Sequence, residues 1–239
     1  MRLPISWEKF LKNSLELDKF YNLLEEFVEQ YEPILPEKDK IFAVFDYMNP
    51  RDVTCVLFGE DPYPRITSAC GVAFWDKEIN SWTDKTNGNS LKNILKALLV
   101  AQGKAKYSSK IDEVRQIALE LHYKSPPQLF EHWLKQGILL INTSLTFTNS
   151  KDKKQHFEFW KTFHLKLIEA LNKREQSPFY ILWGSKAQKW EQDILESIDD
   201  PEKIIKQGHP TFIHQFLDKN RPDFSPFREI ITKTGLSWY

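Results

Sequence analysis

The sequence contains few cysteines: only Cys55 and Cys70 occur among its 239 residues. Two thiolates cannot by themselves supply the four ligands of a structural zinc or iron–sulfur site. They also cannot build a disulfide-rich scaffold of the kind found in small secreted proteins. The low cysteine content fits a reducing compartment, and we expect a cytoplasmic location.

Long apolar runs and an excess of one charge are also missing. No run approaches the roughly 20 apolar residues that a membrane helix needs, and residues 1–30 are charged throughout, so we expect neither a membrane span nor a signal peptide. Basic and acidic side chains both number 33, so no global basic field indicates nucleic acid. Residues 1–50 are acidic on balance, whereas 51–150 and 151–239 are slightly basic. That bias fits a local phosphate-contacting face and equally fits a mixed surface.

Apolar segments with alternating strand and helix periodicity are abundant. Buried strands are predicted at 53–58, 138–141, 179–183 and 204–205. Helices are predicted up to about residue 29, with a break near 13–18, and at 91–99, 129–136, 159–171, 186–195 and 227–232. Alternating strands and helices predict an α/β fold of three layers around a central four-stranded parallel sheet. We expect one domain, residues 1–239, with residues 1–50 as a helical layer packed on it.

The first predicted strand ends at a loop with the sequence GEDPYP, residues 59–64. Asp61 is therefore expected just past the carboxyl end of a strand, where ligands bind in open α/β sheets. Pro62 and Pro64 restrict the backbone on both sides of Tyr63, so the loop should be stiff. A stiff loop with a carboxylate and an aromatic ring suits a preorganised site, but it also suits an ordinary turn.

The other three predicted strands end at Asn142, Gly184 and, shortly after the last strand, His209. The carboxyl ends of parallel strands meet at one edge of a sheet, so Asp61, Asn142 and His209 are expected to lie together. An acid, an amide and an imidazole form an acid–base and recognition set. This convergence predicts an active site at that edge.

Two further segments carry candidate residues that have structural alternatives. Phe74 follows Gly71 in a segment of small residues and is near enough in sequence to share a pocket with the loop 59–64, although core packing is the commoner role. Ser90 is expected to cap the helix 91–99, whose amide terminus suits a phosphate, and a capped surface helix explains it equally well. Residues 151–156 are expected to form a basic polar loop.

Motifs along the whole chain resemble those of family 1 uracil-DNA glycosylases. Residues 59–63 resemble the family's water-activating loop, and residues 71–74 resemble the loop with its uracil-stacking Phe. The remaining similar segments are 90–94, Trp133 with 135–142 and 145–146, 182–188, 209–211, and the two ends at 5–7 and 236–238. The resemblance implies the uracil-DNA glycosylase fold and release of uracil from DNA by hydrolysis of the N-glycosidic bond, with no metal or organic cofactor.

The resemblance also implies a role for each candidate residue. Asp61 would hold the attacking water, and His209 would donate a hydrogen bond to the departing uracil. The residues implied to bind uracil are Glu60, Tyr63, Phe74 and Asn142, with Tyr63 excluding the methyl group of thymine. The residues implied to contact DNA are Ser90, Ser185, Thr211 and Ile213, with Ile213 as the apolar wedge that fills the vacated base stack.

Three positions and one loop depart from the common form of the family. Glu60 replaces Gln, Pro64 replaces His, and Phe212 replaces a proline. Residues 76–89 replace a proline-rich loop with a longer polar one. Arg65 either supplies a compensating positive charge or is a solvated surface residue.

Two other functions remain open from the sequence: a weakly active homologue that serves DNA binding, replication or protein interaction, and a glycosylase for another modified base. A zinc deaminase is excluded, because the H-x-E triplet at 156–158 has no C-x-x-C after it. His156 is instead expected near the DNA face or in solvent. The implied partners are uracil-containing DNA, single- or double-stranded, and protein inhibitors of the family. We expect a monomer without a membrane partner.

Overall fold

A parallel sheet of four strands forms the centre of the computed structural model, which describes residues 1–84 and 88–239. Its strands are β1 (Cys55–Gly59), β2 (Ile138–Asn142), β3 (Phe179–Trp183) and β4 (Ile204–Gln207), in the order β2-β1-β3-β4. Every residue of β1 and β2 is buried, as expected for strands that are covered on both faces. Gly59 pairs with Asn142, so the loops after β1 and β2 begin at the same level.

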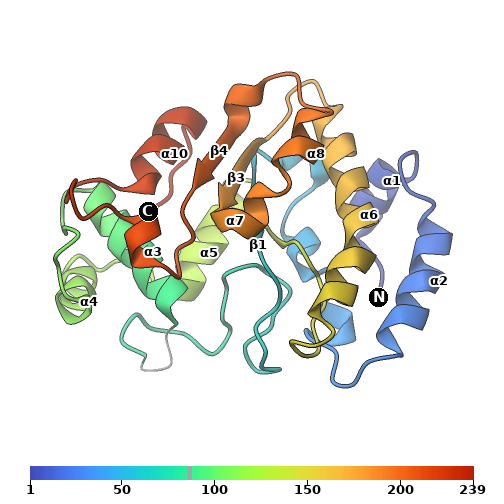
Figure 1. Cartoon of the computed structure of the whole chain (residues 1–239), viewed down its shortest axis with the longest axis horizontal. Helices are drawn as coiled ribbons and strands as arrows, with labels where there is room; N and C mark the ends of the chain where they lie inside the picture. The colour runs from blue at the N-terminus through green and yellow to red at the C-terminus, as the bar shows by residue number, and fades with distance from the viewer. Residues whose placement is uncertain (85–87) are drawn as a thin grey trace.

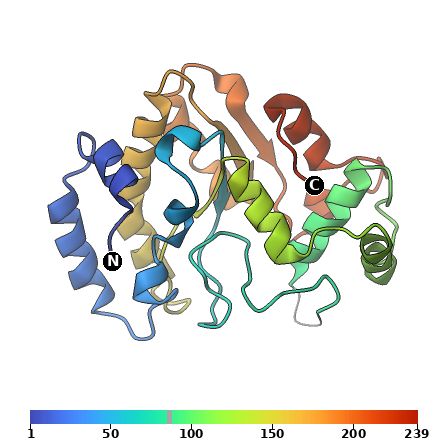
Figure 2. The ribbon, with the colours of Figure 1, turned by 180° about the vertical axis from the view of Figure 1, so that it is seen from behind.

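Helices cover both sides of the sheet (Figure 1). One side carries α3 (Asn89–Ala101), α4 (Ile111–Glu120), α5 (Pro126–Lys135) and α10 (Pro226–Thr234). The other side carries α1 (Ile5–Leu11), α2 (Leu17–Val28), α6 (Lys153–Asn172) and α8 (Glu191–Leu195), and the view from behind shows the same division (Figure 2). Short helices α7 (Gly184–Gln188) and α9 (Ile213–Phe216) follow β3 and β4. The predicted three-layer α/β fold is therefore confirmed.

The N-terminal helices pack on the outside of α6 through aromatic rings. The rings of Phe20 and Phe163 stack with their centres 5.3 Å apart, and those of Phe27 and Phe159 stack at 4.1 Å. A single cluster of buried apolar side chains continues from these helices through the sheet to Trp238 near the C-terminus. The N-terminal layer thus supports α6, the helix that begins beside the carboxyl edge of the sheet.

Two helix starts differ from the prediction. The helix predicted at 159–171 begins earlier, at Lys153, because residues 153–158 contain no proline or glycine that would prevent a helix. The predicted basic loop at 151–156 is therefore largely the first turn of α6. The helix predicted from Leu91 begins at Asn89 after Gly88, so Ser90 is inside the helix and does not cap it.

One other predicted segment also differs, and another is only partly described. The region 186–195 forms two short helices, α7 and α8, instead of one. Residues 85–87 of the predicted loop 76–89 lie outside the described residues. Across the described ranges, no helix combines the length and apolar character needed to cross a bilayer.

Candidate active site

A cavity of about 200 Å³ lies at the carboxyl edge of the sheet, with room for a ligand about the size of one pyrimidine ring. The loop 59–64 and the segment 69–74 line one part of it, and Asn142, His209 and Thr211 line the rest together with Ser90. The teal ribbon after β1 marks the first two segments in Figure 1. The predicted convergence of strand ends is therefore present in the structure.

Asp61 is largely buried and is paired with a lysine that no sequence motif indicated. Its Oδ2 lies 2.9 Å from Nζ of Lys153, which also lies 2.8 Å from Oε1 of Glu60. Burial raises the pKa of Asp61 above its ordinary value, and the ammonium of Lys153 opposes that rise. Asp61 can therefore remain a carboxylate in a partly desolvated place.

His209 lines the cavity with a defined proton arrangement. The backbone N–H of Thr211 donates to Nδ1 of His209 at 3.1 Å, so the neutral ring carries its proton on Nε2. Burial lowers the pKa of His209, an effect that the charge of Glu60 only partly opposes. The imidazole is thus a neutral hydrogen-bond donor.

Glycine at two strand ends lets the site residues approach the sheet closely. A Cβ atom on Gly184, whose φ is +81°, would lie 2.6 Å from Cβ of His209. A Cβ atom on Gly59 would lie 2.2 Å from Oδ1 of Asn142. These distances are too short for real carbon atoms, so both glycines are needed to place His209 and Asn142 where they are.

Asn142 is buried at the end of β2 and lines the cavity. No residue in the described ranges forms a hydrogen bond with its side-chain amide, which leaves the amide available to a ligand. The loop beside it is fixed to the loop 59–64: Thr143 Oγ1 and Ser144 N donate to the carbonyl of Glu60 at 2.8 and 3.1 Å. Two of the loops that form the site are therefore joined by hydrogen bonds to a backbone carbonyl.

Tyr63 and Phe74 form an aromatic wall. The hydroxyl of Tyr63 donates to the carbonyl of Phe74 at 3.2 Å, and burial raises the pKa of Tyr63, so the donor stays protonated. Phe74 has a φ of +65°, an uncommon conformation for a residue with a side chain, and its ring packs edge-on against Trp183 at 5.4 Å. A strained residue held at a cavity often marks a functional position.

Ser90 and Thr211 meet although 121 residues separate them. Their hydroxyl groups lie 2.6 Å apart, and the nearby Asn93 donates from Nδ2 to the carbonyl of Pro210 at 2.7 Å. These bonds join the start of α3 to the loop after β4. Both hydroxyls line the cavity, so the pair forms a polar rim.

The other two predicted DNA-contacting residues do not line the cavity. Ser185 is exposed in the first turn of α7. Ile213 begins α9 and is partly buried against the core, whereas its neighbour Phe212 is 50% exposed. The apolar group that projects most from this loop is therefore Phe212.

The structure resolves one surface expectation and corrects another. Arg65 is an exposed surface residue, 48% accessible, whose charge is already paired with buried Asp76 at 2.8 Å and with Glu78 at 3.1 Å. His156 is buried, with its Nδ1 2.9 Å from Thr146 Oγ1 and its ring 4.5 Å from that of Tyr31. His156 thus packs between elements that are distant in sequence, whereas Arg65 forms its ion pairs within its own segment of the chain.

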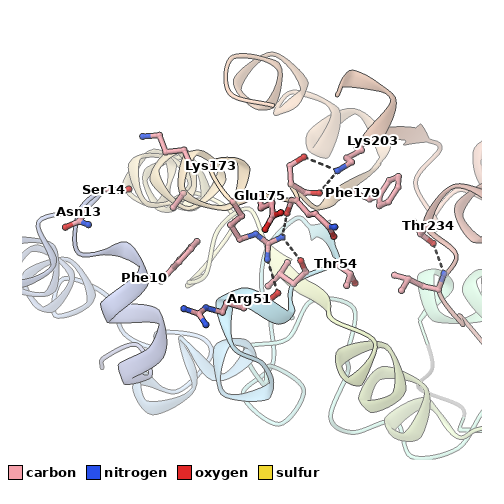
Figure 3. Close-up of a pocket in the computed structure, with 16 residues that line it drawn as sticks. Phe10, Asn13, Ser14, Arg51, Thr54, Lys173, Glu175, Phe179, Lys203 and Thr234 are labelled. Atoms are coloured by element: carbon pink, nitrogen blue, oxygen red, sulfur yellow. Dashed lines mark hydrogen bonds between the residues drawn. The ribbon is translucent and has the colours of Figure 1, made fainter. Parts of the chain in front are cut away.

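A second and larger cavity, of about 900 Å³, lies at the opposite edge of the sheet (Figure 3). The guanidinium of Arg174 in this cavity donates to three backbone carbonyls, those of Pro50, Val53 and Gln176, at 2.6, 2.6 and 3.0 Å. Lys203 similarly donates to the carbonyl of Ser177 at 2.8 Å. These cations stabilise loops at the amino ends of the strands, so the chemistry is expected at the smaller cavity.

No cluster of three or more His, Cys, Asp or Glu side chains within residues 1–84 and 88–239 is arranged to hold a metal ion. The smaller cavity instead combines a carboxylate, a neutral imidazole, an amide and two aromatic rings. On a parallel α/β sheet, that set suits hydrolysis at a flat heterocycle. The Uracil DNA glycosylase superfamily model matches residues 45–232. The chain belongs to this superfamily.

Relatives from several bacteria are similar over most of the chain. Uracil-DNA glycosylase of Fusobacterium nucleatum is 32% identical over 209 residues, which cover 86% of this chain and 80% of the relative. The Clostridium perfringens protein of the same name is 31% identical over 207 residues, with the same two coverages.

Solved structures share the fold. The wild-type UNG of Nitratifractor salsuginis is 26% identical, covers 88% of this chain and 85% of its own, and has a TM-score of 0.66. A mimivirus UNG variant in complex with UGI is 22% identical, covers 87% and 70%, and has a TM-score of 0.62. At that identity, the second similarity concerns the fold alone.

Proposed function

We propose that this chain flips deoxyuridine out of DNA and hydrolyses its N-glycosidic bond, which releases uracil and leaves an abasic site in base excision repair. The observation that carries this proposal is the meeting of Asp61, Asn142 and His209 around one base-sized cavity. Extrusion of a nucleotide costs a few kcal/mol of stacking and pairing, and contacts inside such a cavity offset that cost. The names of the bacterial relatives support the same activity.

The charges at the cavity suit cleavage through a cationic sugar and an anionic base. The Asp61 carboxylate attracts positive charge that develops on the sugar, and one of its oxygens holds the attacking water. The Nε2–H of neutral His209 donates to uracil O2, where negative charge develops. A neutral donor is suitable because it stabilises the leaving base without itself attracting the carboxylate.

The walls of the cavity suit uracil more than the other bases. The amide of Asn142 can pair with uracil O4 and N3–H, whereas cytosine presents the opposite donor–acceptor pattern. Phe74 and Tyr63 both line the cavity, and we expect Phe74 to stack on the base and Tyr63 to exclude a methyl group at C5. Ser90 and Thr211 at the rim are suited to flanking phosphates, contacts that position DNA without reading its sequence.

The competing functions receive less support. Curated relatives of similar length are named as glycosylases, which favours the enzyme over an inactive binding homologue. A preference for another modified base would depend on the residues that line the cavity, and alternative substrates test it. Monomeric state, cytoplasmic location and binding of a protein inhibitor stay predictions.

Release of uracil from an oligonucleotide with one deoxyuridine tests the proposal directly. We expect base release from single- and double-stranded substrates by the purified chain, residues 1–239. Matched oligonucleotides with thymine, 5-hydroxymethyluracil or hypoxanthine identify a different base preference. Intact DNA binding without release of uracil would contradict the proposal and favour the binding homologue.

Asp61→Asn tests the role of the carboxylate. The variant keeps the shape of the side chain but loses its charge, so we expect single-turnover cleavage to slow by at least about a hundredfold. Binding to a uracil-containing oligonucleotide should change far less, because the carboxylate acts mainly on the transition state. Equal losses in cleavage and binding would argue against a water-holding carboxylate.

A further inference from the structure

One ammonium group holds two carboxylates at the candidate active site. Nζ of Lys153 lies 2.9 Å from Oδ2 of Asp61 and 2.8 Å from Oε1 of Glu60. Among the residues that the structure describes, none donates a hydrogen bond to Oδ1 of Asp61. Lys153 therefore fixes one oxygen of the carboxylate and leaves the other for the attacking water.

The place of Lys153 in α6 shows that the helix alone does not favour this cation. Lys153 is the first residue of α6, and the positive end of a helix dipole is unfavourable for an ammonium. The first turn of α6 contains no acidic residue, and the N-cap residue Asp152 makes no side-chain capping hydrogen bond. The side chain instead extends to the loop 59–64, with its ammonium also 5.7 Å from the centre of the Phe157 ring. Its stabilising partners are thus Glu60, Asp61 and Phe157.

The sum of the charges explains why a second carboxylate stands beside Asp61. Asp61 and Lys153 alone form a neutral pair, and at 2.9 Å the ammonium would cancel much of the attraction between Asp61 and a cationic sugar. Glu60 brings the group of three to a net charge of −1. Glutamate at position 60, where the related motif has glutamine, thus has an electrostatic reason in this chain.

We propose that Lys153 and Glu60 are a matched pair around Asp61: Lys153 is a positioning residue that fixes the ionised carboxylate, and Glu60 restores the negative charge that faces the sugar. The role in hydrolysis rests on the proposed function. Other charged groups nearby do not replace the pair. Lys186 lowers the pKa of Asp61 through its charge and forms no ion pair with it in the described structure, and His209 is neutral.

Opposite pH shifts in two single variants test the pair. Removal of the ammonium in Lys153→Met should raise the pKa of Asp61 and move the acid limb of single-turnover uracil release up by at least about one pH unit. Glu60→Gln should move the same limb down, because Glu60 raises the pKa of Asp61. Glu60→Gln should also lower the plateau rate by about tenfold, because the remaining pair is neutral.

The double variant and a matched control make the test specific. Lys153→Met with Glu60→Gln should come closer to the wild-type rate than Glu60→Gln alone, since no ammonium then opposes Asp61. Lys154→Met removes an exposed lysine from the next position of α6 and should leave the acid limb in place. The proposal would be overturned if the losses in cleavage rate of the two single variants simply added in the double variant. It would also be overturned if Lys153→Met left the acid limb unmoved and instead made DNA binding weaker and less dependent on salt.

A titration of the Asp61 carboxyl carbon by NMR separates this inference from the proposed function. In the DNA-free protein, the Asp61 pKa should rise in Lys153→Met, fall in Glu60→Gln and stay unchanged in Lys154→Met. This result does not depend on any catalysed reaction. Equal Asp61 titrations in all four proteins would refute the matched pair even if uracil is released, and absence of uracil release with the expected titrations would refute only the proposed function.

Discussion

At the residue scale, Tyr63 is restrained at both its side chain and its backbone, so its ring forms a rigid wall of the cavity. Its hydroxyl is bound to the carbonyl of Phe74, and Pro62 and Pro64 restrict the backbone on both sides. Loss of apolar fit alone separates two ligands that differ by a methyl group by only about 1–3 kcal/mol. A wall that cannot retreat adds a steric clash to that difference, so the exclusion of thymine should depend on this ring.

Tyr63→Ala should therefore release thymine from a thymine-containing oligonucleotide, an activity that the wild-type chain should lack. Uracil release should fall by about tenfold or more, because the cavity loses a packing surface. Tyr63→Phe is the matched control: it loses the hydroxyl bond but keeps the ring between Pro62 and Pro64, so it should keep most of the exclusion. If the wild type releases thymine, or if none of the three proteins does, then Tyr63 is not the residue that excludes the methyl group of thymine.

Single residues were predictable from the sequence where they end a strand and unpredictable where they reach across the fold. Asp61, Asn142 and His209 follow apolar runs, so the parallel topology alone brings them together. Lys153 was missed because its contact depends on where α6 begins and on the direction of its side chain. The burial of His156 under Tyr31 was missed for the same reason: no local pattern reports a contact between distant segments.

At the element scale, the turn from β3 into α7 determines where the imidazole of His209 lies. Gly184→Ala adds a Cβ atom that would lie 2.6 Å from Cβ of His209, at a φ that favours glycine. We expect the loop after β4 to be displaced, uracil release to fall by at least about tenfold, and stability to fall by about 1–3 kcal/mol. Activity and urea unfolding measure the two effects. Gly103→Ala is the control, since it has a similar φ but no neighbour within 4 Å and should change stability alone.

Two apolar residues at the start of α9, Phe212 and Ile213, have different surroundings. Phe212 is 50% exposed, while Ile213 packs partly against the core. Phe212→Ala should therefore weaken release of uracil from duplex DNA more than Ile213→Ala, and single-stranded substrates should be less affected by either change. If Ile213→Ala instead loses more activity on duplex DNA than Phe212→Ala does, then Ile213 is the wedge, as the sequence resemblance implies.

Elements were predicted well where apolar periodicity is strong and poorly at their ends. The four strands agree with the predicted runs to within two residues at their ends. The start of α6 and the division of 186–195 into two helices were not visible, because the residues there suit helix, turn and solvent alike. Element ends depend on capping and tertiary contacts, which a periodic pattern does not contain.

At the scale of the whole molecule, buried histidines link stability to pH. His164 is fully buried among aromatic rings, and burial lowers its pKa to about 3 from an ordinary 6.5. The unfolded chain therefore binds a proton at His164 as the pH falls below 6.5, while the folded chain does so only near pH 3. Stability should be complete above pH 6.5 and should decrease through this window.

His164→Leu should reduce the loss of unfolding free energy between neutral pH and pH ~5 by about 2 kcal/mol, because one titrating group is removed. Urea unfolding at the two pH values measures the difference. The buried His156, whose pKa burial lowers to about 4, should leave part of the pH dependence in the variant. An unchanged dependence in His164→Leu would show that His164 does not contribute to acid sensitivity.

The hydrogen bond from the backbone of Thr211 to Nδ1 of His209 also has a consequence for the kinetics of a population of molecules. Neutral imidazole in water interconverts between two forms, and a catalyst that needed only one of them would spend part of its time inactive. Here the backbone amide selects one form before any DNA is bound. Every copy of the protein can thus meet its substrate with a proton on the same nitrogen, and turnover need not wait for that equilibrium.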